Sequence, residues 1–491
     1  MTQGSIQTSE FNRLLQYIEE VTGITVPDTN YRTLTEAVTN RTKAMSATVP
    51  QYISILRADP SERERFLNAV TINETYFFRE SRHFTIMKDI LLPEFSRTGE
   101  PVLAWSATCA TGEEGISLAL ILQDFFGGDT GTRFTVYATD LNTAALSHIK
   151  EGIYAKNSFR EDGREYHHLI DNHSTGIGKA RKISADIISG IHVAQKNLFL
   201  DTLEDMPDSF HIVFLRNTLI YMKGEKKLAL LRRVVSRIRD GGYLFLSSSE
   251  MPLVVHPELE IIEKGDIYFF RKKKHLPRSL ESSAIKSMSH TKGPALQSGH
   301  ERWAQTRNTT PQIPSSISVN AVLNAAQILS ENRNPDLIKD DAVRVTAELL
   351  LYSIHFINTM KLTSARDLLN SIAQHFNTEI TLHLQGFIAM LEGERHTAAS
   401  FFRSALTHNA SFWPSMFYLA NTIKDYDPLE AAKEFTRCRD TLACSSASRG
   451  PQYGFLVEHF SEKYFFDLCD SWIQSLQKVS QHQQSGVQPC R

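Results

Sequence analysis

The chain has 491 residues, and its 53 basic and 55 acidic side chains leave a net charge close to zero. That balance gives no global field to draw it to nucleic acid or a lipid surface, and the length predicts two or three domains. Five scattered cysteines argue against a disulfide framework, and neither a signal core at the start nor a membrane-length apolar stretch is found, so we expect a cytoplasmic protein without direct membrane insertion.

The first seventy residues predict a small helical bundle. Apolar residues recur at helical spacing between Gly, Pro and Asp in residues 11–23, 31–45, 49–58 and 62–72. We therefore expect an N-terminal helical domain over residues 1–75.

Four apolar runs then alternate with helical patterns. They occupy residues 102–105, 134–138, 210–215 and 243–247. Alternation of this kind is typical of an α/β domain with a mostly parallel, doubly wound sheet, here predicted over residues 76–274. Because parallel strands end at one edge, we expect the residues after them, Glu113, Asp140, Asn197 and the pair Arg216–Asn217, to share a crevice.

The turn after the first strand indicates what that crevice binds. Residues 106–112 are mostly small and lead to Glu113 and Glu114, without the Gly-x-Gly-x-x-Gly pattern of pyrophosphate sites. An acidic pair suits a cation, which favours the sulfonium and amino groups of S-adenosylmethionine, although an ordinary strand–helix corner is the alternative. Asp140, at the tip of the next strand, fits the hydroxyls of a ribose but could also cap the following helix.

Seven short segments of the chain form a recognisable series. They are Asn-x-Thr-x-Phe-Phe-Arg at 73–79, Trp-Ser-Ala…Thr-Gly-Glu-Glu at 105–114, Ala-Thr-Asp at 138–140, Gly-x-Tyr at 152–154, Asn-Leu at 197–198, Arg-Asn-x-x-Ile-Tyr at 216–221 and Gly-Gly-Tyr-Leu-Phe-Leu…Ser-Glu at 241–250. In this order, the chain over about residues 9 to 272 resembles the CheR family of chemoreceptor glutamate methyltransferases. The resemblance implies a Rossmann-like, S-adenosylmethionine-dependent fold behind an N-terminal bundle.

The resemblance also implies roles for the residues that hold the cofactor. Asn73, Thr75 and Arg79 would close over its methionine end, with Arg79, a catalytic residue, beside the reacting methyl. Glu113 would hold the amino group, and Asp140 the ribose.

The remaining roles concern adenine and the substrate. Asn197 and Leu198 would contact adenine, whereas Arg216, Asn217 and the second catalytic residue, Tyr221, would wall the methyl-transfer site. A glutamate carboxylate is already ionised near neutral pH, so the reaction needs no general base and no metal. No Cys/His cluster at metal-ligand spacing occurs in the sequence.

Two features test the resemblance locally. Thr108 stands where the family usually has a small residue, and its β-branched side chain is expected to affect affinity for the cofactor. The segment that would offer basic side chains to an acidic receptor carries Arg32, Arg41 and Lys43 but also Glu36, so a plain solvated helix face is an equal alternative. Residues 155–194 correspond to a small β-subdomain inserted in the family.

The C-terminal half predicts a linker and a helical array. Residues 275–318 are rich in Ser, Thr, Pro, Gln and Gly, which is typical of a flexible linker. Beyond it, Ala365, Ala398 and Ala432 recur at spacings of 33 and 34, close to the tetratricopeptide period. We expect a tetratricopeptide-like domain over residues 319–480, with a non-repeat bundle as the alternative. Its concave surface would bind a protein partner and move relative to the catalytic domain.

Together these features predict a methyltransferase that modifies glutamates on the cytoplasmic helices of a chemoreceptor or a related signalling receptor, with the array binding a partner or regulating activity. Two other classes remain open. One is a scaffold whose cofactor site has decayed, and the other is a methyltransferase acting on a different substrate. The absence of an aromatic–basic motif argues against nucleic acid as that substrate.

Overall fold

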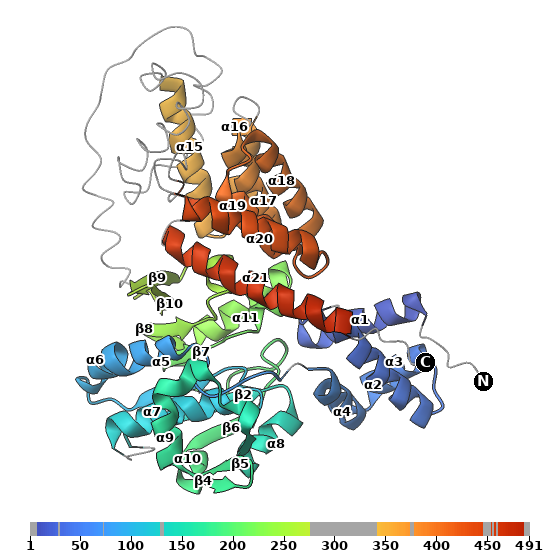
Figure 1. Cartoon of the computed structure of the whole chain (residues 1–491), viewed down its shortest axis with the longest axis vertical. Helices are drawn as coiled ribbons and strands as arrows, with labels where there is room; N and C mark the ends of the chain where they lie inside the picture. The colour runs from blue at the N-terminus through green and yellow to red at the C-terminus, as the bar shows by residue number, and fades with distance from the viewer. Residues whose placement is uncertain are drawn as a thin grey trace.

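The structure is a computed structural model of the whole chain (Figure 1). It describes residues 7–274, apart from 28–29, 72 and 128–131, and residues 341–485, apart from 374–377, 445–452, 454–455 and 458–459. The predicted linker over 275–318 and the start of the predicted array up to residue 340 lie outside the described residues. No helix in the described ranges combines the length and apolar character needed to cross a membrane.

The N-terminal bundle forms as the helical spacing predicts. Its helices are α1 (Thr8–Thr22), α2 (Tyr31–Ala44), α3 (Val49–Ala58) and α4 (Pro60–Val70). Thr48 and Asp59 cap α3 and α4 by accepting hydrogen bonds from the first-turn amides. Leu14, Val38 and Phe66 lie in the core that the four helices share.

A seven-stranded sheet forms the centre of the next region. Its spatial order is β6-β2-β1-β7-β8-β10-β9. The five strands from β6 to β8 are parallel, whereas β10 pairs antiparallel with both β8 and the edge strand β9. The bounds are β1 (Val102–Ser106), β2 (Phe134–Asp140), β6 (Ile191–Gln195), β7 (Phe210–Phe214), β8 (Ile238–Phe245), β9 (Leu259–Lys264) and β10 (Ile267–Lys272). The predicted parallel sheet is confirmed, and β6, β9 and β10 are additional.

Alternate residues of the central strands enter two different cores. Ala104 and Ile212 face one core, whereas Trp105 and Val213 face the other. The first core is covered by the short helices before β1, by the helices that follow β1 and β2, and by two further short helices before β6, whereas α11 covers the second core. These helices are α5 (Ser81–Ile86), the π-helix η2 (Met87–Leu91), α6 (Leu92–Ser96), α7 (Glu113–Phe126), α8 (Thr143–Glu151), α9 (His167–Asn172), α10 (Ala185–Ser189) and α11 (Gly224–Ser236).

A three-stranded antiparallel sheet is inserted after α8, in the segment expected to hold a β-subdomain. Its order is β3-β5-β4, with β3 (Ile153–Ala155), β4 (Ser174–Ile177) and β5 (Ala180–Ile183). The described part of this half also contains the 3₁₀ turns η3 (Lys156–Ser158), η4 (Glu161–Tyr166), η5 (Leu219–Tyr221) and η6 (Met251–Leu253).

Successive antiparallel helix pairs make up the C-terminal array. Its helices are α15 (Asp341–Asn358), α16 (Leu362–Ala373), α17 (Glu379–Leu391), α18 (Arg395–His408), α19 (Trp413–Ile423), α20 (Pro428–Ala443) and α21 (Glu462–Ser485). Ala365 and Ala398 are fully buried at the helix contacts, as the repeat spacing predicts. Ala432 is only partly buried, because its neighbour Ala431 occupies the contact in the third pair.

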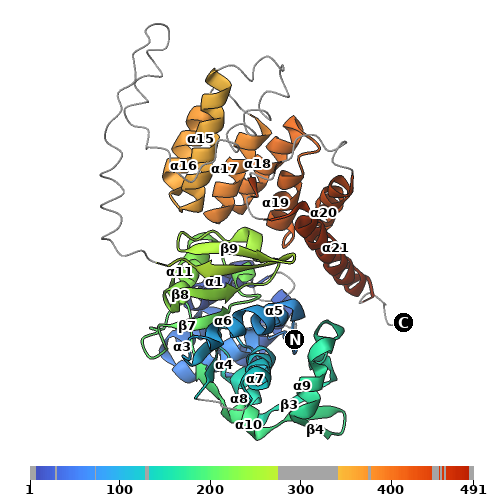
Figure 2. The same cartoon turned by 90° about the vertical axis from the view of Figure 1, so that its left-hand side faces the viewer.

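The array is docked on the sheet region, which corrects the prediction of an open concave surface that moves on a linker. All residues of α19 and most of α17 are buried, whereas α18 and α20 each expose one face. Residues of α11, such as Leu230, share one continuous apolar core with Leu384 of α17 and Trp413 of α19. Figures 1 and 2 both show β9 next to the array.

Close backbone contact accompanies this apolar core. Gly224, at the start of α11, lies so close to the turn between α17 and α18 that a Cβ on it would stand 2.4 Å from the carbonyl oxygen of Glu392. The Tyr418 hydroxyl on α19 donates to the carbonyl of Pro252 at 3.2 Å. The sheet region of the same chain therefore covers α17 and α19, the two most buried helices of the array.

Candidate functional site

One cavity lies at the carboxyl ends of β1, β2 and β7, the edge predicted to bind a ligand. The N-terminal bundle closes it from the other side, because Ile24 forms an antiparallel bridge with Met222 and the Thr25 amide donates to the Tyr221 carbonyl at 2.7 Å. Its lining combines apolar residues of the bundle, such as Ile18 and Val26, with the polar residues that follow the strands.

Nine of the ten residues predicted for the site line this cavity. They come from four separate segments, and the fold brings them together. The nine are Asn73, Thr75, Arg79, Asp140, Asn197, Leu198, Arg216, Asn217 and Tyr221.

Glu113 is the exception among the ten, and its predicted contact with the cofactor stays a prediction. Its carboxylate accepts hydrogen bonds from the hydroxyls of Thr111 at 2.6 Å and Ser158 at 2.8 Å, and it does not line the cavity. Gly112 starts α7 with a φ of 96°, a left-handed conformation that favours glycine, and Glu114 is the member of the acidic pair that lines the cavity.

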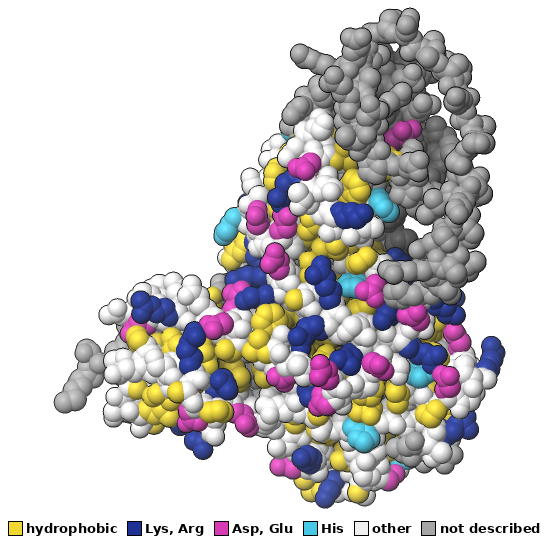
Figure 3. Space-filling view, turned by 180° about the vertical axis from the view of Figure 1, so that it is seen from behind, with side chains coloured by type: hydrophobic (Ala, Val, Ile, Leu, Met, Phe, Trp, Pro, Cys, Tyr) yellow, Lys and Arg dark blue, Asp and Glu magenta, His cyan; other side chains and the backbone are white. Residues whose placement is uncertain are grey.

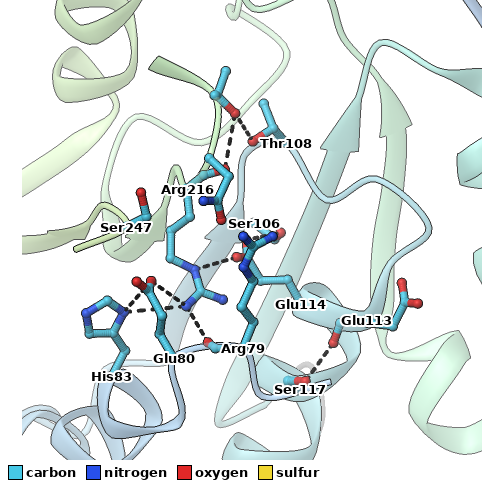
Figure 4. A network of polar contacts seen from close by, with 12 residues as sticks. Arg79, Glu80, His83, Ser106, Thr108, Glu113, Glu114, Ser117, Arg216 and Ser247 are labelled. Carbon is cyan, nitrogen blue, oxygen red and sulfur yellow. Dashed lines mark hydrogen bonds and ion pairs between the residues drawn. The ribbon is translucent and has the colours of Figure 1, made fainter. Parts of the chain in front are cut away.

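A buried guanidinium organises the polar side of the cavity (Figure 4). Arg216 donates through Nε to Glu114 at 2.7 Å and through Nη1 to the Arg79 carbonyl at 2.5 Å, and Nη1 lies 3.5 Å from a carboxylate oxygen of Glu80. Its Nη2 atom is buried and has no hydrogen-bond partner within the described part of the chain. A buried donor of this kind indicates a place for an acceptor on a ligand.

Two carboxylates face this one guanidinium, so the network favours a cationic ligand. Burial opposes ionisation of Glu80, but the interaction with His83, the charge of Arg216 and a hydrogen bond from the Ser248 amide together lower its pKa. Burial lowers the pKa of the adjacent His83 to about 4, so His83 is neutral near pH 7. Neither Glu80 nor His83 was predicted, although Glu80 directly follows the Asn-x-Thr-x-Phe-Phe-Arg motif.

Asp140 stands at the tip of β2 with its carboxylate fixed by the backbone. It accepts from the amides of Asn142 at 2.9 Å and Ala110 at 2.8 Å. Burial raises the pKa of Asp140, and these two amides oppose that rise. Since a carboxylate has about four acceptor positions, two remain for ligand hydroxyls. The capping role left open for Asp140 belongs to Asn142, whose side chain caps α8.

Asn197 lines the cavity, but its amide group is used within the protein. The side-chain oxygen accepts from the amides of Phe199 and Leu200, and the side-chain nitrogen donates to the Val21 carbonyl of α1 at 2.7 Å. This side chain therefore shapes the loop and ties it to the N-terminal bundle, while Leu198 supplies an apolar wall.

The loop that carries Arg216, Asn217 and Tyr221 is held by a residue that sequence reasoning missed. Glu250 is almost fully buried, and its carboxylate accepts from six donors. They are the amides of Asn217, Thr218, Leu219, Ile220 and Ser247 and the hydroxyl of Ser247, at 2.7 to 3.3 Å. The only sequence signal was its place at the end of the last family motif.

Two residues of the turn after β1 have defined environments. The Thr108 hydroxyl lies 2.7 Å from that of Thr218, so the β-branched residue is accommodated by a partner across the cavity wall. Cys109 is buried, and burial together with the charge of Asp140 raises the pKa of its thiol well above the usual range. Cys109 is thus a small packing residue rather than a reactive thiol.

Comparison with known proteins relates this site to a family. Residues 9–71 match the family described as "CheR methyltransferase, all-alpha domain", and residues 73–277 match "CheR methyltransferase, SAM binding domain". The chain is 30% identical over 255 residues to the "Chemotaxis protein methyltransferase" of Salmonella typhimurium, covering 51% of this chain and 86% of that protein. It is 29% identical over 253 residues to the protein of the same name from Escherichia coli, covering 50% and 85%. It is also 29% identical over 251 residues to "Chemotaxis protein methyltransferase Cher2" of Pseudomonas putida, covering 49% and 90%.

Proposed function

The chain belongs to the CheR methyltransferase family and is an S-adenosylmethionine-dependent methyltransferase of chemotaxis, and we propose that it methylates glutamate side chains on the cytoplasmic helices of a chemoreceptor. One observation above all supports this proposal: predicted site residues from four segments converge on one cavity, whose buried guanidinium retains a donor without a partner in the described part of the chain. A cytoplasmic location follows from the substrate that we propose.

The donor set fits S-adenosylmethionine. Asp140 offers two acceptor positions to the ribose hydroxyls, and Leu198 offers an apolar wall to adenine. The carboxylate excess around Arg216 suits a sulfonium, and Asn73 and Thr75 lie on the same cavity wall as Arg79. Glu114, rather than Glu113, takes the acidic position at the methionine end.

The protein's part in the reaction is to orient and to exclude water. When bound, S-adenosylmethionine supplies an electrophilic methyl group and a neutral thioether leaving group. Nη2 of Arg216 would hold the incoming glutamate carboxylate, which needs no base because it is already ionised. Arg79 and Tyr221 would line its approach, and burial raises the pKa of Tyr221, so its hydroxyl stays protonated and can donate. Alignment of this kind supplies much of the rate in a displacement reaction.

Receptor docking through the basic side chains of α2 receives little support. Arg32 pairs with Glu36 at 2.9 Å, and Arg41 pairs with the buried Glu62, so two of the three basic residues already have acidic partners. Figure 3 shows positive and negative side chains interspersed over the face that it displays. We therefore expect the docking of the receptor to depend weakly on salt.

The direct test is methylation of purified receptor fragments. The full-length protein is incubated with methyl-labelled S-adenosylmethionine and cytoplasmic fragments of candidate receptors, and label is measured as alkali-labile methyl ester. The matched control is the same fragment with its candidate glutamates changed to alanine. Label that depends on those glutamates supports the proposal. Cofactor binding in calorimetry without any label on receptors would refute the receptor substrate, and no cofactor binding would favour a scaffold with a decayed site.

A further inference from the structure

The array is linked to the methyl-transfer site through the backbone of one residue, Ser248. Ser248, which follows β8, donates its amide hydrogen to Glu80 at 2.9 Å, and its carbonyl accepts from the hydroxyl of Tyr464 on α21 at 2.6 Å. Glu80 in turn faces Arg216, whose Nη1 lies 3.5 Å away. A continuous line of polar contacts therefore runs from the C-terminal helix to the guanidinium in the cavity.

The same turn also holds the loop that carries Arg216. Ser247, the neighbour of Ser248, donates through both its amide and its hydroxyl to Glu250. Glu250 accepts from the amides of the loop that follows Arg216. A shift of the turn at 247–250 would consequently move Glu80 and that loop together.

Tyr464 is well placed to hold this turn. Its side chain is 8% exposed, and its ring lies 4.7 Å from that of Tyr268 on β10 and 5.1 Å from that of Phe460. The Tyr268 hydroxyl accepts from the amide of Ser461 at 3.0 Å, which fixes the first turn of α21 on the sheet. Burial and the nearby charge of Glu80 raise the pKa of Tyr464 well above its usual range, so the hydroxyl keeps its proton and can donate.

We propose that Tyr464 is a positioning residue for methyl transfer, which acts through Ser248 and Glu80 on Arg216 and makes α21 a working part of the methyltransferase. The proposal rests on the function proposed above. It assigns to the C-terminal array a role inside the enzyme. Because Asp140 and Leu198 hold the nucleoside end at other strand ends, cofactor binding should depend on Tyr464 less than methyl transfer does.

The experiment compares three variants of the full-length chain with the wild type. Tyr464→Phe removes the hydroxyl and keeps the ring, Glu80→Gln weakens the next contact, and the double variant combines them. The control, Lys463→Met, removes a surface ion pair with Asp266 from the same turn of the same helix. Thermal unfolding, the Kd of S-adenosylmethionine, and kcat and KM for receptor methylation are measured for each.

We expect Tyr464→Phe to lower kcat about fivefold or more, with the cofactor Kd changed less than about twofold and Lys463→Met close to wild type. The double variant should be no more than about twofold slower than Glu80→Gln, since both substitutions break one line of contacts. Unchanged kcat, multiplicative losses in the double variant, or failure of Tyr464→Phe to fold would each overturn the proposal. An inactive wild type that still binds cofactor would instead refute the receptor substrate proposed above.

Discussion

Replacing Glu250 with Gln tests how the site loop is held. In the wild type, Oε1 accepts from the amides of residues 218–220, and Oε2 accepts from those of Asn217 and Ser247 and from the Ser247 hydroxyl. The amide group of Gln must place a donor against one of these sets. The less costly choice places the new NH₂ group at the Oε2 position. It leaves the amides of Asn217 and Ser247 without an acceptor, whereas the Ser247 hydroxyl can rotate and accept.

Each buried amide without an acceptor costs about 1–3 kcal/mol, so Glu250→Gln should lower the free energy of unfolding by about 2–6 kcal/mol. That is a large part of the stability of an ordinary domain. Urea unfolding followed by circular dichroism measures it, and Glu263→Gln, at an exposed position of β9, serves as the control and should change stability by less than about 0.5 kcal/mol. The folded fraction should also lose methyl transfer, because Arg216 and Tyr221 flank the loosened loop. A destabilisation below about 1 kcal/mol with unchanged kcat would show that Glu250 does not hold the loop.

Three further substitutions or conditions test the cavity, the interface and the buried histidines. Asp140→Asn should weaken S-adenosylmethionine binding about tenfold or more in calorimetry, since a charge-assisted hydrogen bond contributes about 1.5–3 kcal/mol, and equal affinity would remove Asp140 from the site. Gly224→Ala should destabilise the chain more than Gly178→Ala does. Both glycines have a positive φ, but only at Gly224 would the new methyl group meet backbone atoms, those of Glu392, and equal melting temperatures of the two variants would contradict this contact. The free energy of unfolding should be highest above about pH 6.5 and fall toward pH 4, because four histidines with lowered pKa are neutral in the folded protein and protonate more readily in the unfolded chain. Each histidine can lower the free energy of unfolding by up to about 1.4 kcal/mol per pH unit. Equal urea stability at pH 7 and pH 5 would refute this last expectation, which concerns His83, His211, His256 and His383.

The sequence predicted the sheet and the place of the cavity because both follow from local patterns. Apolar runs mark strands whatever surrounds them, and parallel strands present their carboxyl ends at one edge. Asp140 and Arg216 therefore reach one cavity, although 76 positions separate them. Short strands with polar residues, such as β9, in which only Leu259 is buried, carry a weaker signal and were missed.

The spacing of residues in a motif did not predict which way each side chain points. Glu113 and Glu114 are adjacent carboxylates, and only the left-handed turn at Gly112 decides which of them lines the cavity. The same limit applies to Glu250, whose role depends on six donors from two separate segments. A motif records residue types in order, whereas hydrogen-bond geometry depends on how distant segments meet.

The helical array shows most clearly which features the sequence predicts and which only the tertiary structure decides. Its repeat spacing, with Ala365 and Ala398 buried at helix contacts, was legible in the sequence because each helix pair is a local unit. Helical periodicity identifies an apolar face but does not say what covers it. Only the tertiary structure shows that α11 and the sheet edge cover α17 and α19, and that Tyr464 reaches Ser248. The physical reason is that burial of an apolar face lowers the free energy with any complementary surface, so the choice of surface is made by long-range packing.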